Sequence, residues 1–352
     1  MPDSSLGLLI LIIILAVGFG VVNGFNDAAN AIAPAIGTRA LSPRDALIIA
    51  VIANMAGAAT GTLVAKTIGK GILVPEAISY PVVIAALAAI IIWGTLATYM
   101  GMPISLHHGF IAGLAGAGMA VAGIKAVVWS VMRWILAAVV VAPLLGFIGG
   151  FVMMVCLYWA FRRSAPDKMR RNFSKLQYLT TAFMAYSHGK NDGQMPIGVI
   201  TMALVIYYEQ IGQIEQAAAL WDRLSLLDPG LWWIIVISAL AISAGTAMGG
   251  WRVIKTIGMR VTNLRPVQGF AAQASAATVI EIASHGAFIW PWGIPVSTTH
   301  CISTSVMGVG STQRFSAVRW GIAGNIIAAW ILTFPICGVL GYLFTWLLKL
   351  IF

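Results

Sequence analysis

Long apolar segments alternate with short polar ones along the whole chain. Six runs are long enough to cross a bilayer as a helix, which takes about 17 to 25 residues: residues 6–22, 46–65, 82–100, 135–161, 231–248 and 321–352. Within lipid, only helices and closed barrels satisfy every backbone hydrogen bond internally. Runs of this length and apolarity therefore predict an all-α polytopic membrane protein.

The composition supports this fold class. Of 352 residues, 60% are hydrophobic and only 9% are charged, whereas soluble domains contain about 25% charged residues. The formal net charge is +10, a value that in a soluble protein would suggest a nucleic-acid partner. Here the basic residues lie mainly between the apolar runs, which is the pattern of a topology signal. We therefore expect lipid, and no nucleic acid, as the surrounding partner.

The basic residues also predict an orientation. Residues 162–175 contain six Lys or Arg side chains against Asp167 alone, and this segment is expected on the cytoplasmic side of the plasma (inner) membrane. The loop over residues 207–229 is mainly acidic and is expected on the opposite side. Basic residues from Arg252 to Arg265 return to the cytoplasmic side, so the three assignments agree with one another.

Three landmarks occur twice, in the same order. The segment GFNDAAN at 24–30 aligns with GKNDGQM at 189–195, KTIG occurs at 66–69 and 255–258, and MPISLHHG at 102–109 aligns with IPVSTTHC at 294–301. This duplication predicts a membrane repeat over 1–161, a basic linker over 162–175 and a second membrane repeat over 176–352. Many secondary transporters consist of two inverted-topology repeats with re-entrant or broken helices and a site at the repeat interface. We expect this architecture, with about 10–12 membrane segments.

The first repeated motif predicts a cation site. Asn26 and Asn30 are four residues apart and share a helix face, with Asp27 beside them. A carboxylate within the membrane is costly and faces a partner, a cavity or an ion, and amide and carboxylate oxygens suit a hard cation such as Na⁺. The alternative is that these groups only hydrogen-bond helices together. The predicted Na⁺ ligands are Asn26, Asp27, Asn191 and Asp192.

The third repeated motif predicts an anion site. In GIPVSTTH, at 293–300, a proline followed by hydroxyl residues is typical of a helix start. A helix N-terminus presents free N–H groups and a positive dipole end to an anion. The alternative is ordinary capping of a broken helix. We expect a tetrahedral oxyanion to contact Ser105, Ser297, Thr298, Thr299, Asn30 and Gln194.

Taken together, these motifs resemble the PiT family of inorganic phosphate transporters. The resemblance rests on the two G-x-N-D motifs, SHGKNDGQMPIGVI, GGWRVIKTIG and GIPVSTTH, and covers nearly the whole chain. It implies symport of phosphate with Na⁺, or with H⁺ as in many bacterial members, through inverted repeats and commonly as a homodimer. Two departures stand out. Leu106 and His107 stand where the second copy of the third motif has Thr298 and Thr299. Asn54 stands where some members carry an acidic residue.

Three further residues are candidates for proton coupling. His188 precedes the second G-x-N-D motif and matches the family. Glu281 and His285 are four residues apart on an apolar segment, and histidine titrates near physiological pH. For these last two the simpler interpretation is a mutually satisfied buried pair.

The functional alternatives differ in class. The first is Na⁺-coupled phosphate symport by alternating access, and the second is H⁺ coupling, or sulfate as the substrate of the same fold. A membrane enzyme acting on phosphorylated lipids is a third, but the sequence has no Gly-rich phosphate loop or compact metal-ligand cluster. A passive channel is the fourth. We expect a transporter rather than an enzyme, with Na⁺ as coupling ion and no other cofactor.

Overall fold

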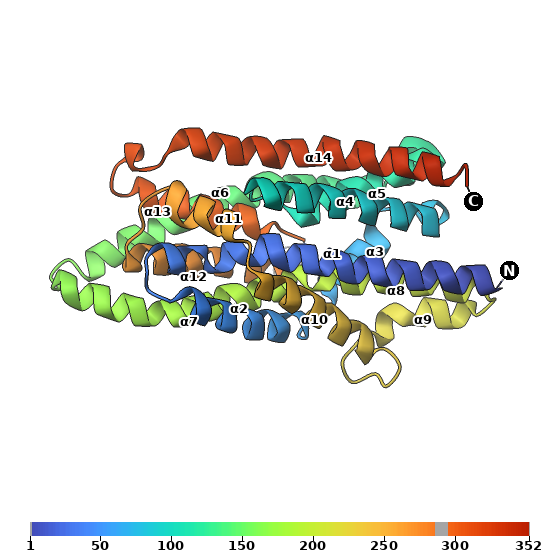
Figure 1. Ribbon diagram of the computed structural model, residues 1–352, viewed down its shortest axis with the longest axis horizontal. Helices are drawn as coiled ribbons and strands as arrows, with labels where there is room; N and C mark the ends of the chain where they lie inside the picture. Colours follow the sequence, from blue (N-terminus) through green and yellow to red (C-terminus); the bar gives the residue numbers. More distant parts are fainter. Residues whose placement is uncertain (1, 286–294, 352) are drawn as a thin grey trace.

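The computed structural model describes residues 2–285 and 295–351. Within these ranges every extended secondary-structure element is a helix, and the one β contact is an isolated bridge between Leu73 and Val127. The predicted all-α fold is confirmed. The helices form an elongated bundle with both chain termini at the same end (Figure 1).

The first half of the chain begins and ends with a long helix and contains a helical hairpin between these two in the sequence. Its elements are α1 (Pro2–Gly37), α2 (Pro43–Ala58), α3 (Leu63–Gly71), the 3₁₀ turn η1 (Pro75–Ala77), α4 (Tyr80–Met100), α5 (Leu106–Ala122), η2 (Gly123–Ala126) and α6 (Trp129–Ala160).

The second half follows the same plan with eight described α-helices in place of six. Its elements are α7 (Pro166–Asp192), α8 (Gln194–Gln210), α9 (Ile214–Arg223), α10 (Trp232–Met248), α11 (Trp251–Lys255), the π-helical η3 (Thr256–Arg260), α12 (Pro266–His285), α13 (Thr298–Ser311), η4 (Phe315–Ala317) and α14 (Trp320–Leu348). Helix α7 begins inside the segment predicted as a linker, because Pro166 is well suited to the first helical position. Most of that basic segment is therefore helical.

Among the described residues, five helices are long and apolar enough to cross a membrane, or seven if each bent pair forms one span. The bent pairs are α2 with α3, at 64°, and α10 with Trp251–Arg260, at 62°. Helices α7 and α12 are long enough but too polar for this criterion, since α7 carries charged residues at its start and in its motif and α12 carries Gln268, Gln273 and Glu281. The apolar helix α6 has only 22% of its most hydrophobic window buried, so most of that surface is available to lipid. The chain is a multi-pass membrane protein with broken helices, and the expected 10–12 segments remain a prediction.

Helices of one half pack against helices of the other. Helix α1 packs on α10 and its counterpart α7 on α2, while α5 packs on α14 and its counterpart α13 on α6. The α4–α5 hairpin lies toward the end with the termini, and the α12–α13 hairpin lies toward the other end (Figure 1). Paired contacts and opposed hairpins are what inverted repeats produce.

Glycines let helices from the two different halves approach each other closely. A β-carbon at Gly116 of α5 would lie 2.0 Å from the carbonyl oxygen of Gly338 in α14, and one at Gly341 would lie 2.2 Å from that of Gly113. Small residues at such spacings are typical of membrane helix pairs. The glycine-rich stretch at 113–123 thus brings the first hairpin against the last helix.

Candidate functional site

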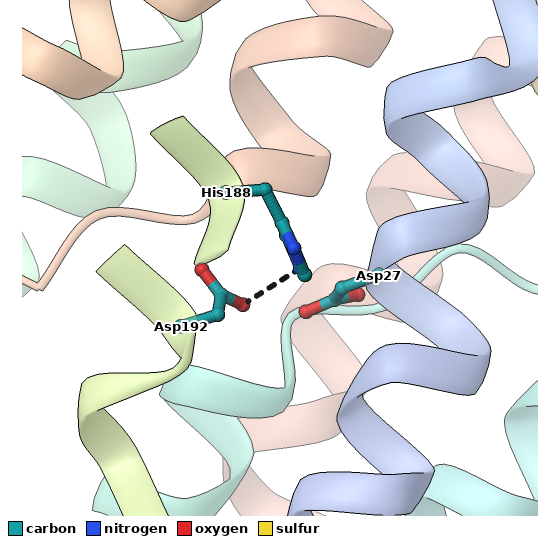
Figure 2. A group of neighbouring side chains, drawn as sticks. All are labelled: Asp27, His188 and Asp192. Atoms are coloured by element: carbon teal, nitrogen blue, oxygen red, sulfur yellow. Dashed lines mark ion pairs between the residues drawn. The ribbon is translucent and has the colours of Figure 1, made fainter. Parts of the chain in front are cut away.

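The two motif carboxylates meet in the middle of the bundle. Asp27 comes from α1 and Asp192 from the end of α7, and their exposed fractions are 2% and 0%. Together with His188 they form a buried cluster in which one ligand atom from each residue lies within 4.8 Å of the others (Figure 2). The motif of each half therefore contributes to one shared site.

Asp27 contacts both hairpins. The hydroxyl of Thr299, in the first turn of α13, donates to Asp27 Oδ1 over 2.8 Å. The backbone of Leu106, at the start of α5, lies near the Asp27 carboxylate. Asp27 thus lies at both hairpin tips, and the Thr299 hydroxyl stabilises part of its negative charge.

Asp192 is surrounded by nitrogen atoms. Asn23 Nδ2 donates to Asp192 Oδ2 over 3.2 Å, and Asn191 Nδ2 donates to Oδ1 over 3.0 Å. Two imidazoles lie beside Oδ2. His107 Nδ1 is at 3.4 Å, and His188 Nε2, drawn in Figure 2, is at 3.5 Å. A protonated histidine at either position would pair with this carboxylate.

The surroundings of the two carboxylates correspond through the repeat. Alignment of the tips places His107 at the position of Thr299, so that the tip residue of each half contacts the carboxylate of the other. The side chains differ, because a hydroxyl faces Asp27 and an imidazole faces Asp192. The two halves of the site are related in position but not in chemistry.

Helix α1 presents a row of amide oxygens. Asn23, Asn26 and Asn30 are spaced on one helix face, and their side-chain nitrogens donate to Asp192, Thr98 and Thr299. Their three Oδ1 atoms are buried and have no hydrogen-bond partner among the described residues. Buried polar atoms are rarely left unpaired. Three orphaned carbonyl oxygens beside Asp27 fit a hard cation such as Na⁺.

Both predicted helix starts occur at the hairpin tips. Ser105 is the N-cap of α5 and accepts from His108 N over 3.3 Å, and Ser297 is the N-cap of α13 and accepts from His300 N over 3.1 Å. Each serine therefore caps a helix, which is the alternative to an anion site that the sequence left open. Its own O–H can still donate a hydrogen bond to an anion. Thr298 Oγ1 is buried without a partner in the part of the chain that the structure describes.

Two of the predicted site residues have other partners. Gln194 Oε1 accepts from Val64 N over 2.7 Å and from Ala65 N over 3.1 Å, and its Nε2 donates to Lys190 O over 2.5 Å. Its amide thus caps the start of α3, and a contact of Gln194 with the anion stays a prediction.

Glu281 Oε2 pairs with Lys190 Nζ over 2.9 Å. Glu281 thus forms an ion pair with the lysine of the HGKND motif, and its expected pairing with His285 stays a prediction. The side chain of His285 lies outside the described residues.

The neutral residue at position 54 lies beside the site. Asn54 Oδ1 is 2.7 Å from His188 Nδ1, and Asn54 Nδ2 donates to Thr246 over 3.1 Å. The amide thereby orients the imidazole that faces Asp192. An acidic residue here would contact His188 rather than the carboxylate pair.

Sequence reasoning assigned no role to Asn23 and Trp330. Asn23 is four residues before Asp27, and this spacing could have indicated it. Trp330 Nε1 donates to Pro103 O of the first tip over 2.9 Å, and the Trp330 ring stacks on His300 of the second tip at 3.9 Å. One tryptophan of α14 therefore contacts both tips. Nothing in an apolar helix rich in aromatic residues signals this role.

Comparisons with known proteins agree with this geometry. Residues 23–341 match the model of the phosphate transporter family. A probable low-affinity inorganic phosphate transporter of Bacillus subtilis (strain 168) is 38% identical over 99% of this chain and 100% of its own length. One of Rhizobium meliloti (strain 1021) is 36% identical over 97% of both chains.

A solved structure, described as the sodium-dependent phosphate transporter, superposes with a TM-score of 0.86 at 26% identity. The superposition covers 98% of this chain and 100% of that one. The family match, the full-length relatives and the shared fold all point to a transporter and not to an enzyme. This chain belongs to the phosphate transporter family.

Proposed function

We propose that this protein is a Na⁺-coupled symporter of inorganic phosphate that works by alternating access. The observation that carries the proposal is the row of three unpartnered, buried amide oxygens of Asn23, Asn26 and Asn30 beside Asp27. The names of the relatives support phosphate as substrate, and that of the structural neighbour supports Na⁺.

Na⁺ ions are bound by oxygens around the carboxylate pair. Asn26 and Asp27 serve one ion and Asn191 and Asp192 a second, with Asn23 between them. Phosphate lies at the hairpin tips, against the hydroxyls of Ser105, Ser297, Thr298 and Thr299 and the amide of Asn30. Both tips are helix N-termini, whose free N–H groups and dipole favour an anion.

Charge provides the coupling. Two buried carboxylates repel an anion strongly, because charges interact far more in a protein interior than in water. A bound cation near each carboxylate removes this repulsion and adds attraction for phosphate. Phosphate therefore binds well only after the cations, and transport of one requires the other.

The opposed hairpins provide the two gates. Both tips lie at Asp27, since Thr299 of one hairpin is hydrogen-bonded to its carboxylate and Leu106 of the other lies near it. Withdrawal of one tip would open the site toward one end of the bundle while the other stays closed, as alternating access requires. We further propose a homodimer in the plasma (inner) membrane, with the basic end of the bundle cytoplasmic.

A second candidate is H⁺-coupled phosphate symport. The observation that favours it is the pair of imidazoles, His107 and His188, at 3.4 Å and 3.5 Å from Asp192. A proton carried there would replace one of the two Na⁺ ions. In that case Asp27 would keep a cation role and Asp192 would form part of a proton site.

Phosphate uptake by purified protein in proteoliposomes tests both. Radiolabelled phosphate is supplied with an inward Na⁺ gradient or with an acid-outside pH gradient, each with and without excess unlabelled sulfate. Uptake driven by Na⁺ and indifferent to sulfate supports the first proposal. Uptake driven by the pH gradient alone supports the second, and block by sulfate would contradict phosphate selectivity.

A further inference from the structure

A basic hollow lies at the end of the bundle where α7 begins. It has a volume of about 890 Å³, and its walls come from the turn after α1, the first turns of α7 and the start of α12. These segments lie together at the end opposite the chain termini (Figure 1). Its cationic side chains are Arg39, Lys168, Arg170, Arg171 and Lys175.

Most of these cations lack an acidic partner. Arg170 lies 3.6 Å from Asp167 in an exposed pair. For the other four cations, no ion pair is formed with any described residue. Concentrated positive charge in a concave surface attracts anions. The hollow therefore suits a ligand with one or more negative charges.

Arg39 is held in place by an unusual backbone. Its φ is 60°, the left-handed conformation in which glycine is the usual residue after a helix. The turn is closed by hydrogen bonds from Thr38 N to Pro34 O and from Ala40 N to Ala35 O, and the Thr38 hydroxyl lies 2.6 Å from Gln177 Oε1 on α7. A strained residue that is kept by such contacts often has a functional reason. Here the strain places a cation at the rim of the hollow.

The surface of α7 changes from basic to apolar toward the middle of the bundle. Lys168, Lys175 and Leu179 share one face, since seven and eleven residues correspond to nearly whole turns. Leu179 is 67% exposed, and Leu176 and Phe183 nearby are also exposed. The basic residues would face the charged head group of a lipid, and the apolar residues that follow along α7 would face its acyl chains. Inorganic phosphate alone would use only the basic part.

We propose that this hollow binds the phosphate head group of an anionic phospholipid, whose acyl chains lie along the apolar face of α7. Basic pockets at the membrane surface recognise such head groups. Positive charge needed only for topology would require neither a concave shape nor a strained, anchored Arg39. Because α7 also carries His188 and Asp192, the bound lipid contacts the helix that forms one side of the transport site.

Lipid binding to the full-length protein in neutral detergent tests this proposal. Bound lipid is counted by native mass spectrometry and affinity is measured by titration, with phosphatidylglycerol, phosphatidylcholine and inorganic phosphate as the probes. The hollow is altered by Arg39→Gln with Arg171→Gln, or by Arg171→Gln alone if the pair does not fold. The matched control is Arg44→Gln with Arg314→Gln, which removes the same charge from exposed positions at the same end of the bundle. Leu179→Ser tests the apolar face.

The expected result is binding of phosphatidylglycerol that weakens by about tenfold in the hollow variant and stays unchanged in the control. Leu179→Ser should weaken phosphatidylglycerol as well. Equal loss in the hollow variant and the control would overturn the proposal in favour of general surface charge. Equal binding of the two lipids would also overturn it. Binding of inorganic phosphate that weakens in the hollow variant, stays unchanged in the control and is insensitive to Leu179→Ser would assign the hollow to the free anion instead, because phosphate at the transport site would be unaffected by all three changes.

Discussion

The hydroxyl of Thr299 donates to the carboxylate of Asp27 over 2.8 Å, although the two residues are 272 positions apart in the chain. Asp27 belongs to the first repeat and Thr299 to a hairpin tip of the second. Any withdrawal of that hairpin must break this bond or carry Asp27 with it. The contact therefore links the charge state of the site to the position of a gate.

Thr299→Ala should lower coupled phosphate uptake strongly, whereas Thr299→Ser should retain most of it. A hydrogen bond to a charged group contributes about 1.5–3 kcal/mol, which corresponds to roughly tenfold to hundredfold in apparent affinity. Na⁺ dependence of uptake in proteoliposomes measures the effect. Thr278→Ala, which removes an exposed hydroxyl from α12, is the control. Equal uptake by the alanine and serine variants would show that the Thr299 hydroxyl has no role in coupling.

Asp27→Asn and Asp192→Asn should each abolish coupled uptake while leaving membrane insertion intact. Each change keeps the shape of the side chain and removes the charge that binds a cation. Insertion is measured by membrane fractionation, and uptake by gradient-driven accumulation of phosphate. Wild-type uptake in either variant would remove the argument for a cation at that carboxylate.

The repeats were readable in the sequence because they depend on chain-local signals. Asn26 and Asp27 correspond to Asn191 and Asp192 by simple alignment, and the hydroxyl after proline marks both helix starts. Inverted packing follows from the duplication only if each half crosses the membrane an odd number of times, since repeats can also be parallel. The fold class and the meeting of the two motifs could therefore be predicted without coordinates.

Side-chain partners were less predictable, because they depend on which helices cross where. Gln194 lies beside the start of α3, so backbone N–H groups take its amide oxygen. Glu281 lies beside Lys190 of α7, a contact that spacing along α12 does not reveal. Trp330 bridges two tips that are far from it in the chain. Each difference is a choice of partner made by tertiary packing.

Ser297→Ala combined with Thr298→Ala should raise the apparent Michaelis constant for phosphate more than that for the cation. The hydroxyl of Thr298 is buried and has no partner among the described residues, so its loss removes a donor for the anion. We expect a rise of about tenfold or more. Ser305→Ala is the control, since that hydroxyl donates to Ala272 O in the same hairpin. An equal rise for both substrates would make the tip purely structural.

Lys190→Met and Glu281→Gln should each destabilise the protein, and the double variant should recover much of the loss. Both side chains are largely buried, at 10% and 16% exposure, and removing either one breaks their buried ion pair, at a cost of about 3 kcal/mol. Thermal unfolding in detergent measures this. Additive losses in the double variant would show that the two charges act independently.

His107→Thr places at Asp192 the hydroxyl that Asp27 receives from Thr299, so the two halves of the site become chemically alike. If His107 takes part in proton coupling, uptake by this variant should lose pH dependence and gain Na⁺ dependence. The physical reason is that a hydroxyl can ligate Na⁺ but cannot carry a proton near neutral pH. His107→Asn is the control, because it removes the imidazole without adding a hydroxyl. Uptake is measured over a pH series at fixed Na⁺ and over a Na⁺ series at fixed pH. An unchanged pH profile in both variants would contradict a role of His107 in proton coupling. Asp192 would then bind a cation, as Asp27 does.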